Sequence, residues 1–269
     1  MSDIVNIACV QMRPMLGDKE YNLEKVKVLL EQNLTSTTDL IVLPEFFNTG
    51  IESNPLINLA ENEQKNETLQ YLSKLAKQYN SYLLAGSIME TRDGKLYNTS
   101  RLLNRNGEEV AKYDKIHLFD SFGGNEHTYC TSGDKVVVAD TDFGKVGLAV
   151  CFDIKFPKHY IELVKQGAEI ILEPAAWCSP KKFADYKKEE WILMNRARAL
   201  DNMVYFVSAN QVGKIDSFLS VYGHSMICAP NGEVLADGGD VEECVITAQI
   251  DLSFLRQLRS QFNMEKYVE

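Results

Sequence analysis

The stretch KVGLAVCFDIKFPKHYIELVKQ, residues 145–166, decides the fold. Residues 146–150 form a short apolar run with β-branched ends, which is typical of a buried strand. Pro157 then begins a segment in which apolar side chains recur at helical spacing, at Tyr160, Ile161 and Val164. Proline suits a first helical turn because the N–H that it lacks would have no helical partner there. The stretch therefore predicts a buried strand followed at once by a helix over 157–166.

Cys151 lies where this strand ends and the chain turns towards the helix. A side chain at that place points out of the C-terminal edge of a sheet, with backbone N–H groups close by. A thiol there can act as a nucleophile beside a ready oxyanion site. The alternative is a small core residue, since free cysteine is among the most buried residue types.

The rest of the chain repeats this alternation. Helices are expected over 21–32, 68–79 and 189–202, the first beginning after Asp18 or Asn22. Asp93-Gly94 and Asn106-Gly107 are typical hairpin turns, so some strand pairs should be antiparallel. Strands are expected over 5–10, 40–43, 81–88, 96–103, 108–112, 169–172, 204–209, 225–229, 233–236 and 243–250. We expect an α/β fold with mixed sheets, and one domain spanning residues 1–269 because no linker interrupts the pattern.

Composition narrows the class of protein. The net charge of −10 disfavours nucleic acid as a partner, and no apolar run approaches the ~20 residues that a membrane span needs. The N-terminus has no basic segment of a secretory signal, so we expect a cytoplasmic protein. The six cysteines are scattered without a C-x-x-C pair, which indicates reduced thiols. Dinucleotide, phosphate-loop and H-E-x-x-H motifs are absent from the sequence, and we expect neither a metal nor a cofactor.

Three charged residues stand out as partners for the thiol. Glu45 follows an apolar strand and Pro44 and precedes two phenylalanines, surroundings that would desolvate its carboxylate. Lys115 lies among apolar residues in YDKIHLFD, where a partly buried ammonium needs an anionic partner or a role. Glu126, in the glycine-rich turn GGNEHTY, is by itself a weak signal, because most loop glutamates are solvated.

A Cys-His hydrolase is the competing arrangement. The candidates are His117, His127, His159 and His224, and none has an evident orienting Asn or Asp partner in the sequence. His224, in VYGHSM, could equally be a core or turn histidine. We therefore treat a Cys-His pair through His224 as the weaker alternative.

Three motifs occur in one order: LPEF at 43–46, KIHLF at 115–119 and AVCFDIKFP at 149–157. Together they resemble the signature of the nitrilase superfamily of carbon–nitrogen hydrolases. The resemblance extends over nearly the whole chain, through VQM at 10–12, EWILMNRARALDN at 190–202, SANQVG at 208–213 and YGHSMICAPNGEVL at 222–235. It implies a four-layer α-β-β-α sandwich and a homodimer or larger assembly formed through helices such as 157–166 and 189–202.

The resemblance also implies roles for individual residues. Glu45 would be the general base, Lys115 the oxyanion stabiliser and Cys151 the nucleophile. Glu126 would be a second acid that holds Lys115 and the substrate in place. Further residues implied at the site are the backbone N–H of Phe152 as an oxyanion donor and the pocket residues Ala176 and Trp177.

Within the superfamily, KIHLFD and Cys-Phe-Asp resemble the branch of omega-amidases and deaminated glutathione amidases, which act on monoamides of small dicarboxylates or related amides. Lys155 and Lys158 depart from that branch, which usually has Arg and Glu there, and Arg and Lys are not interchangeable at a forked contact. The expected activity is hydrolysis of a small linear amide to acid and ammonia through a Cys151 thioester. The alternatives are an N-carbamoyl amino acid or polyamine hydrolase of the same superfamily, or a binding protein without activity.

Overall fold

The computed structural model describes residues 3–34, 37–52, 57–215 and 219–262. The helices are α1 (Lys19–Asn33), α2 (Glu67–Tyr79), α3 (Pro157–Lys165), α4 (Ala184–Asn202) and α5 (Leu252–Phe262). The strands are β1 (Ile4–Gln11), β2 (Leu40–Val42), β3 (Glu61–Asn62), β4 (Tyr82–Leu84), β5 (Ile88–Arg92), β6 (Lys95–Leu103), β7 (Glu109–Asp114), β8 (Val137–Asp140), β9 (Lys145–Leu148), β10 (Ile170–Ala175), β11 (Cys178–Pro180), β12 (Tyr205–Asn210), β13 (Val212–Lys214), β14 (Leu219–Tyr222), β15 (Met226–Cys228), β16 (Val234–Asp237) and β17 (Cys244–Asp251).

Two mixed sheets form the centre of the molecule. The first has the order β17-β1-β2-β4-β6-β5-β3, with β7 paired to β6, and the second has the order β16-β15-β12-β10-β9-β8. In the first sheet β1, β2 and β4 are parallel, whereas the β5-β6 and β6-β7 hairpins are antiparallel. In the second, β9, β10 and β12 are parallel. The predicted mixed pairing is confirmed.

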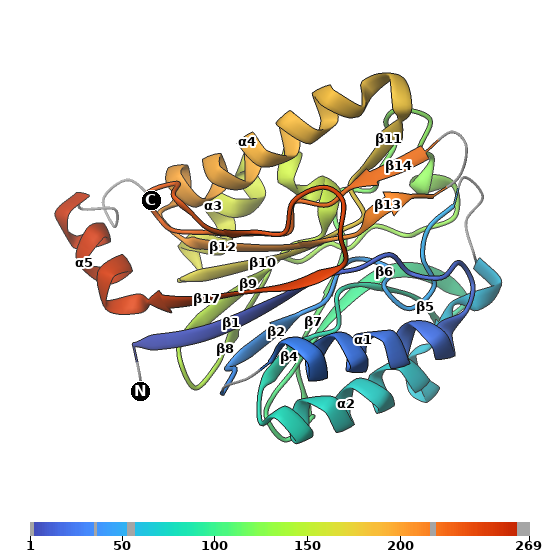
Figure 1. Cartoon of the computed structure of the whole chain (residues 1–269), viewed down its shortest axis with the longest axis horizontal. Helices are drawn as coiled ribbons and strands as arrows, with labels where there is room; N and C mark the ends of the chain where they lie inside the picture. The colour runs from blue at the N-terminus through green and yellow to red at the C-terminus, as the bar shows by residue number, and fades with distance from the viewer. Residues whose placement is uncertain (1–2, 35–36, 53–56, 216–218, 263–269) are drawn as a thin grey trace.

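Helices cover the outer face of each sheet, which gives four layers (Figure 1). Helices α1 and α2 lie on the first sheet, and α3 and α4 lie on the second. The two faces of strand β1 pack in different layers. Ala8 and Val10 pack in the cluster under α1 and α2, while Ile7 and Cys9 pack in the cluster between the sheets, because successive side chains alternate across a strand.

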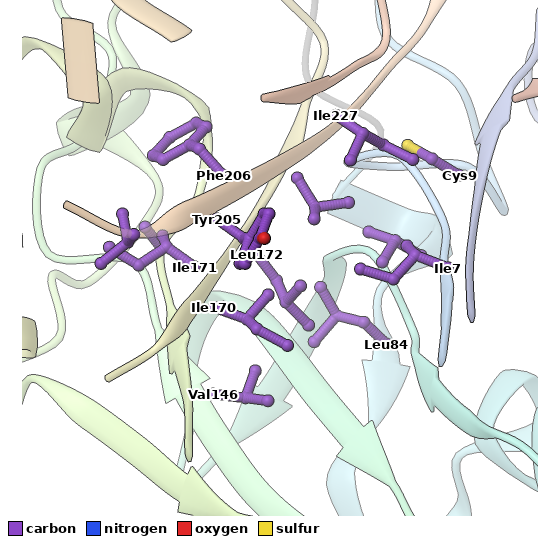
Figure 2. Packing of buried hydrophobic residues seen from close by; sticks show 14 of the residues in the cluster. Ile7, Cys9, Leu84, Val146, Ile170, Ile171, Leu172, Tyr205, Phe206 and Ile227 are labelled. Atoms are coloured by element: carbon purple, nitrogen blue, oxygen red, sulfur yellow. The ribbon is translucent and has the colours of Figure 1, made fainter. Parts of the chain in front are cut away.

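The main core fills the space between the two sheets. Ile7 and Leu84 of the first sheet face Val146 and Ile170 of the second (Figure 2). Burying a side chain of this size contributes about 1.5–3 kcal/mol, so this layer supplies much of the stability.

The local signals account for where the helices begin. The Asp18 side chain accepts a hydrogen bond from the backbone N–H of Tyr21 and so caps α1, which settles the start that the sequence left open. Pro157 is the first residue of α3, as its ring geometry predicts.

Several sequence expectations were wrong in detail. The strand expected over 81–88 is two strands, β4 and β5, because the chain bends at Gly86, whose φ is +43°. The strand expected over 169–172 continues through Pro174 as β10. Helix α4 begins at Ala184, earlier than expected. Ile161, expected in the apolar stripe of α3, is 44% exposed, while His159 takes a buried position.

Within the described residues, no helix combines the length and the apolar character needed to cross a bilayer.

Candidate active site

Glu45, Lys115 and Cys151 come from three distant segments, and each follows shortly after the end of a strand. They follow β2, β7 and β9 respectively. The Nζ atom of Lys115 lies 3.1 Å from Oε1 of Glu45 and 2.9 Å from Oε2 of Glu126. All four side chains are buried, and all four line one cavity of about 350 Å³. The structure therefore brings together the acid, the ammonium, the thiol and the second acid.

Hydrogen bonds to both its side chain and its backbone hold Glu45. The backbone N–H of Ala176 donates to Oε2 at 2.8 Å, and Nδ2 of Asn98 donates to Oε1 at 2.9 Å. The side chain of Gln211 donates to the backbone carbonyl of Glu45 at 2.8 Å. The carboxylate is thus fixed in one orientation between Lys115 and Ala176.

Asn98 is a site residue that sequence reasoning missed. Its Nδ2 donates to both Glu45 Oε1 and Glu126 Oε1, each at 2.9 Å, so one amide joins the two acids. The available signal was its place in the middle of strand β6, since asparagine is depleted from strands. That signal says that an Asn is unusual there, without saying which groups it contacts.

Lys115 is a buried cation between two acids. Burial by itself would lower the pKa of its ammonium, but the carboxylates of Glu126 and Glu45 outweigh that effect and hold the pKa well above its usual value. Glu126 also accepts from the backbone N–H of Phe119 at 2.7 Å. Glu126, a weak signal in the sequence, is therefore a fixed counter-ion of Lys115.

Cys151 occupies the sharp turn predicted after β9. Its φ is +51°, a left-handed conformation that costs a non-glycine residue on the order of 1–3 kcal/mol. The turn is held by Asp153, whose carboxylate accepts from the backbone N–H of Val150 at 2.8 Å. Burial raises the pKa of the Cys151 thiol well above its usual value, and the charge of Glu45 raises it further, whereas Lys115 opposes this. The resting group is therefore a neutral thiol.

Three of the four histidines have aspartate partners, contrary to the expectation from sequence. Nδ1 of His117 lies 2.6 Å from Asp153, and the corresponding distance from His224 to Asp237 is 3.0 Å. His127 is paired with Asp120. However, no hydrogen bond among the described residues joins a histidine to Cys151, so the geometry does not favour a Cys-His pair through His224.

One group of side chains has the composition of a metal site. The donor atoms of His117, Asp153 and His159 lie within 4.8 Å of one another. Asp153 already accepts hydrogen bonds from the Tyr113 hydroxyl, the His117 backbone N–H and Nδ1, and the Val150 N–H. These bonds saturate the carboxylate, and the group is explained as support for the turn at Cys151.

The remaining expected residues lie around the cavity or outside it. Ala176 and Trp177 line it, whereas Phe152 is not among the described lining residues and packs its ring against Phe119 and Phe156. The two departures from the branch pattern lie outside. Lys155 forms an ion pair with Glu190 of α4 at 2.5 Å, and Lys158 is exposed.

Comparisons with known proteins identify relatives over nearly the full length. The profile of the carbon-nitrogen hydrolase family matches residues 6–260. The chain is 34% identical to an omega-amidase of Xenopus tropicalis, over 92% of this chain and 89% of that protein. It is 34% identical to the deaminated glutathione amidase of Dictyostelium discoideum, over 93% and 90%. The crystal structure of Saccharomyces cerevisiae Nit3, a member of branch 10 of the nitrilase superfamily, superposes with a TM-score of 0.84 at 28% identity, covering 96% of this chain and 94% of that one.

Proposed function

Because the chain belongs to the carbon–nitrogen hydrolase family and is a hydrolase of amide C–N bonds, we propose that Cys151 is its nucleophile, with Glu45 as general base and Lys115 as oxyanion stabiliser. The observation that supports these roles is the convergence of the three side chains on one cavity, with Lys115 within 3.1 Å of Glu45. The fixed ion pairs are the preorganised charges that amide hydrolysis requires.

In the first half of the reaction, Glu45 takes the proton of the Cys151 thiol as the sulfur attacks the amide carbon. A base is required because burial holds the pKa of this thiol high. The oxygen of the tetrahedral intermediate would accept from Lys115 and the backbone N–H of Phe152, each donor stabilising it by about 3–4 kcal/mol. The C–N bond then breaks, and Glu45 returns the proton to the nitrogen, which leaves as ammonia.

In the second half, water replaces the departed ammonia. Glu45 takes a proton from the water as its oxygen attacks the thioester carbon, and a second tetrahedral intermediate forms at the same donors. The C–S bond breaks, the carboxylic acid leaves, and the proton on Glu45 returns to the Cys151 sulfur. Glu126 and Asn98 contact neither reacting atom, and they hold Lys115 and Glu45 in place.

The substrate is a small linear amide rather than a peptide, and the reaction is omega-amidase-like. The relatives named omega-amidase and deaminated glutathione amidase support this class, as does a cavity of only about 350 Å³. An N-carbamoyl substrate is the alternative, and it would release carbon dioxide together with ammonia. A screen of succinamate, α-ketoglutaramate, short aliphatic amides and an N-carbamoyl amino acid, with ammonia and carbon dioxide both measured, separates the two.

Replacement of the nucleophile tests the roles directly. Cys151→Ala is expected to lower turnover at least ~1,000-fold without unfolding the protein, because the remaining groups cannot form a thioester. Iodoacetamide should modify Cys151 in parallel with loss of activity, as measured by mass spectrometry. Cys244→Ala, which removes a partly exposed thiol outside the cavity, is the matched control. Activity near that of the unmodified enzyme in Cys151→Ala would refute the mechanism.

We also propose a cytoplasmic homodimer with one domain per chain. The six cysteines are free thiols, which suits a reducing compartment.

The proposed dimer interface lies on α4. Along this helix, apolar side chains recur every seven residues at Tyr186, Leu193 and Leu200, and each is more than half exposed. An apolar stripe of this kind on an outer helix is typical of a subunit interface. The core shared by both sheets supports a single domain.

A further inference from the structure

The cavity is lined by more acidic than basic side chains. Three carboxyl side chains, Glu45, Glu52 and Glu126, line it together with one ammonium, that of Lys115, within the described part of the chain. Lys115 is already shared between Glu45 and Glu126, at 3.1 and 2.9 Å. It therefore offers no surplus positive charge to the far end of a substrate.

Two further lysines, Lys187 and Lys155, are engaged with other groups. The Lys187 ammonium lies 3.8 Å from the ring centroid of Trp177 and forms an ion pair with Glu190 at 2.7 Å. Lys155 pairs with the same glutamate. Neither lines the cavity, so Lys115 is the only basic side chain among its described lining residues.

Glu52 differs from the other two acids. It is partly exposed at the cavity wall, and no hydrogen bond or ion pair to its carboxylate is found among the described residues. Apolar side chains also line the cavity, among them those of Phe46, Ile51 and Met89. A chain of methylene groups can lie against such a wall, and an unpaired carboxylate beside it attracts a cation and repels an anion.

From this geometry we propose that the preferred substrate is a linear amide whose far end is an ammonium group, and that Glu52 is the residue that selects it. The proposal rests on the proposed function, since it concerns the substrate of the same site. It departs from the carboxylate end group that the resemblance to omega-amidases implies. The amide would lie at Cys151, the methylene chain along the apolar wall and the ammonium at Glu52.

Three amides of matched chain length test the proposal: 5-aminopentanamide, pentanamide and glutaramate, with an ammonium, a methyl and a carboxylate end. We expect kcat/KM to fall in that order, with the first at least about tenfold above the last, since one partly exposed ion pair gives about fivefold and the like charge a similar penalty. High salt should reduce the difference in kcat/KM between 5-aminopentanamide and glutaramate, because it screens the charge of Glu52.

Variants assign the selection to Glu52. In Glu52→Gln the ratio of kcat/KM for 5-aminopentanamide to that for pentanamide should fall about fivefold, and Glu52→Lys should shift preference towards glutaramate. Glu233→Gln removes the same charge from an exposed turn outside the cavity and should leave the ratio unchanged. Preference for glutaramate in the unmodified enzyme, or an unchanged ratio in Glu52→Gln, would overturn the proposal while ammonia release kept the proposed function intact. If none of the three amides released ammonia and Cys151 were not labelled, both the proposed function and the proposed role of Glu52 would be refuted.

Discussion

Asn98 shows at the scale of a single residue how a side chain can matter without touching substrate. Its amide joins Glu45 and Glu126, and its Oδ1 atom is buried with no partner among the described residues. The two acids would repel each other if Asn98 and Lys115 did not separate and neutralise them. The asparagine would therefore be a positioning residue for Glu45, the proposed general base.

Asn98→Ala is expected to lower kcat about 10- to 100-fold with a smaller change in KM, because the base loses its orientation while the cavity wall remains. Steady-state kinetics on any hydrolysed amide measures this. Asn195→Ala is the matched control, since it removes a buried amide that bonds only within α4. Equal losses of kcat in the two variants would show that Asn98 acts through stability alone.

Glu173 is a buried acid that the proposed reaction does not use. Burial raises the pKa of its carboxyl well above the usual value, and the charge of Asp153 raises it further. One oxygen accepts from the Tyr160 hydroxyl at 2.7 Å, and the other is without a partner among the described residues. The folded protein therefore keeps a proton that the unfolded chain loses near pH 4.5.

The raised pKa of Glu173 makes the free energy of unfolding depend on pH in one direction. Above pH 4.5 the folded state binds more protons than the unfolded state, so the free energy of unfolding falls as pH rises, by up to ~1.4 kcal/mol per pH unit from this group. Glu173→Gln removes the effect, and its stability relative to the unmodified protein should increase between pH 5 and 8. Urea denaturation at several pH values measures it, with Glu233→Gln as control. A difference that does not change with pH would contradict the assignment.

At the scale of elements, the bend between β4 and β5 positions the segment that carries Glu45, the proposed general base. A Cβ atom added at Gly86 would lie 2.0 Å from the carbonyl oxygen of Pro44, the residue before Glu45. The backbone of Phe46 pairs with Ser87 just beyond the bend, through a 2.7 Å hydrogen bond. The two segments approach so closely that only glycine fits.

Gly86→Ala should therefore destabilise the protein by about 3 kcal/mol or more and lower activity, because Pro44 and Glu45 must shift. Gly94→Ala is a close control, since its φ is also positive, at +72°, but a Cβ there meets no atom within 4 Å. We expect only about 1 kcal/mol for that variant. Similar urea midpoints for the two variants would show that the close approach to Pro44 is not the cause.

At the scale of the whole molecule, the outer surface of α4 exposes large apolar side chains to solvent. Leu193 is 67% exposed and Leu200 is 55% exposed, and α4 forms the outermost layer on its side of the molecule (Figure 1). Multi-angle light scattering is expected to give twice the chain mass of 30.4 kDa. Leu193→Glu with Leu200→Glu should give the mass of one chain, because two carboxylates would be buried without partners. Val28→Glu on α1 is the control. A single-chain mass for the unmodified protein would contradict the proposed dimer.

The sequence by itself determined the α/β alternation, the hairpin turns, the start of α3 at Pro157 and the sharp turn at Cys151. Each depends on neighbours within a few residues, through side-chain periodicity and turn chemistry. The motifs also indicated which acid, ammonium and thiol to consider.

Tertiary structure alone decided what surrounds them. The hydrogen bond from Ala176 to Glu45 spans 131 positions, and the bond from Asn98 to Glu45 spans 53. Likewise, only packing decided that Ile161 faces outward and that Glu52 lies at the cavity wall without a partner among the described residues. Such contacts follow from strand order and register in three dimensions, and no local pattern encodes which distant residue will face a given side chain.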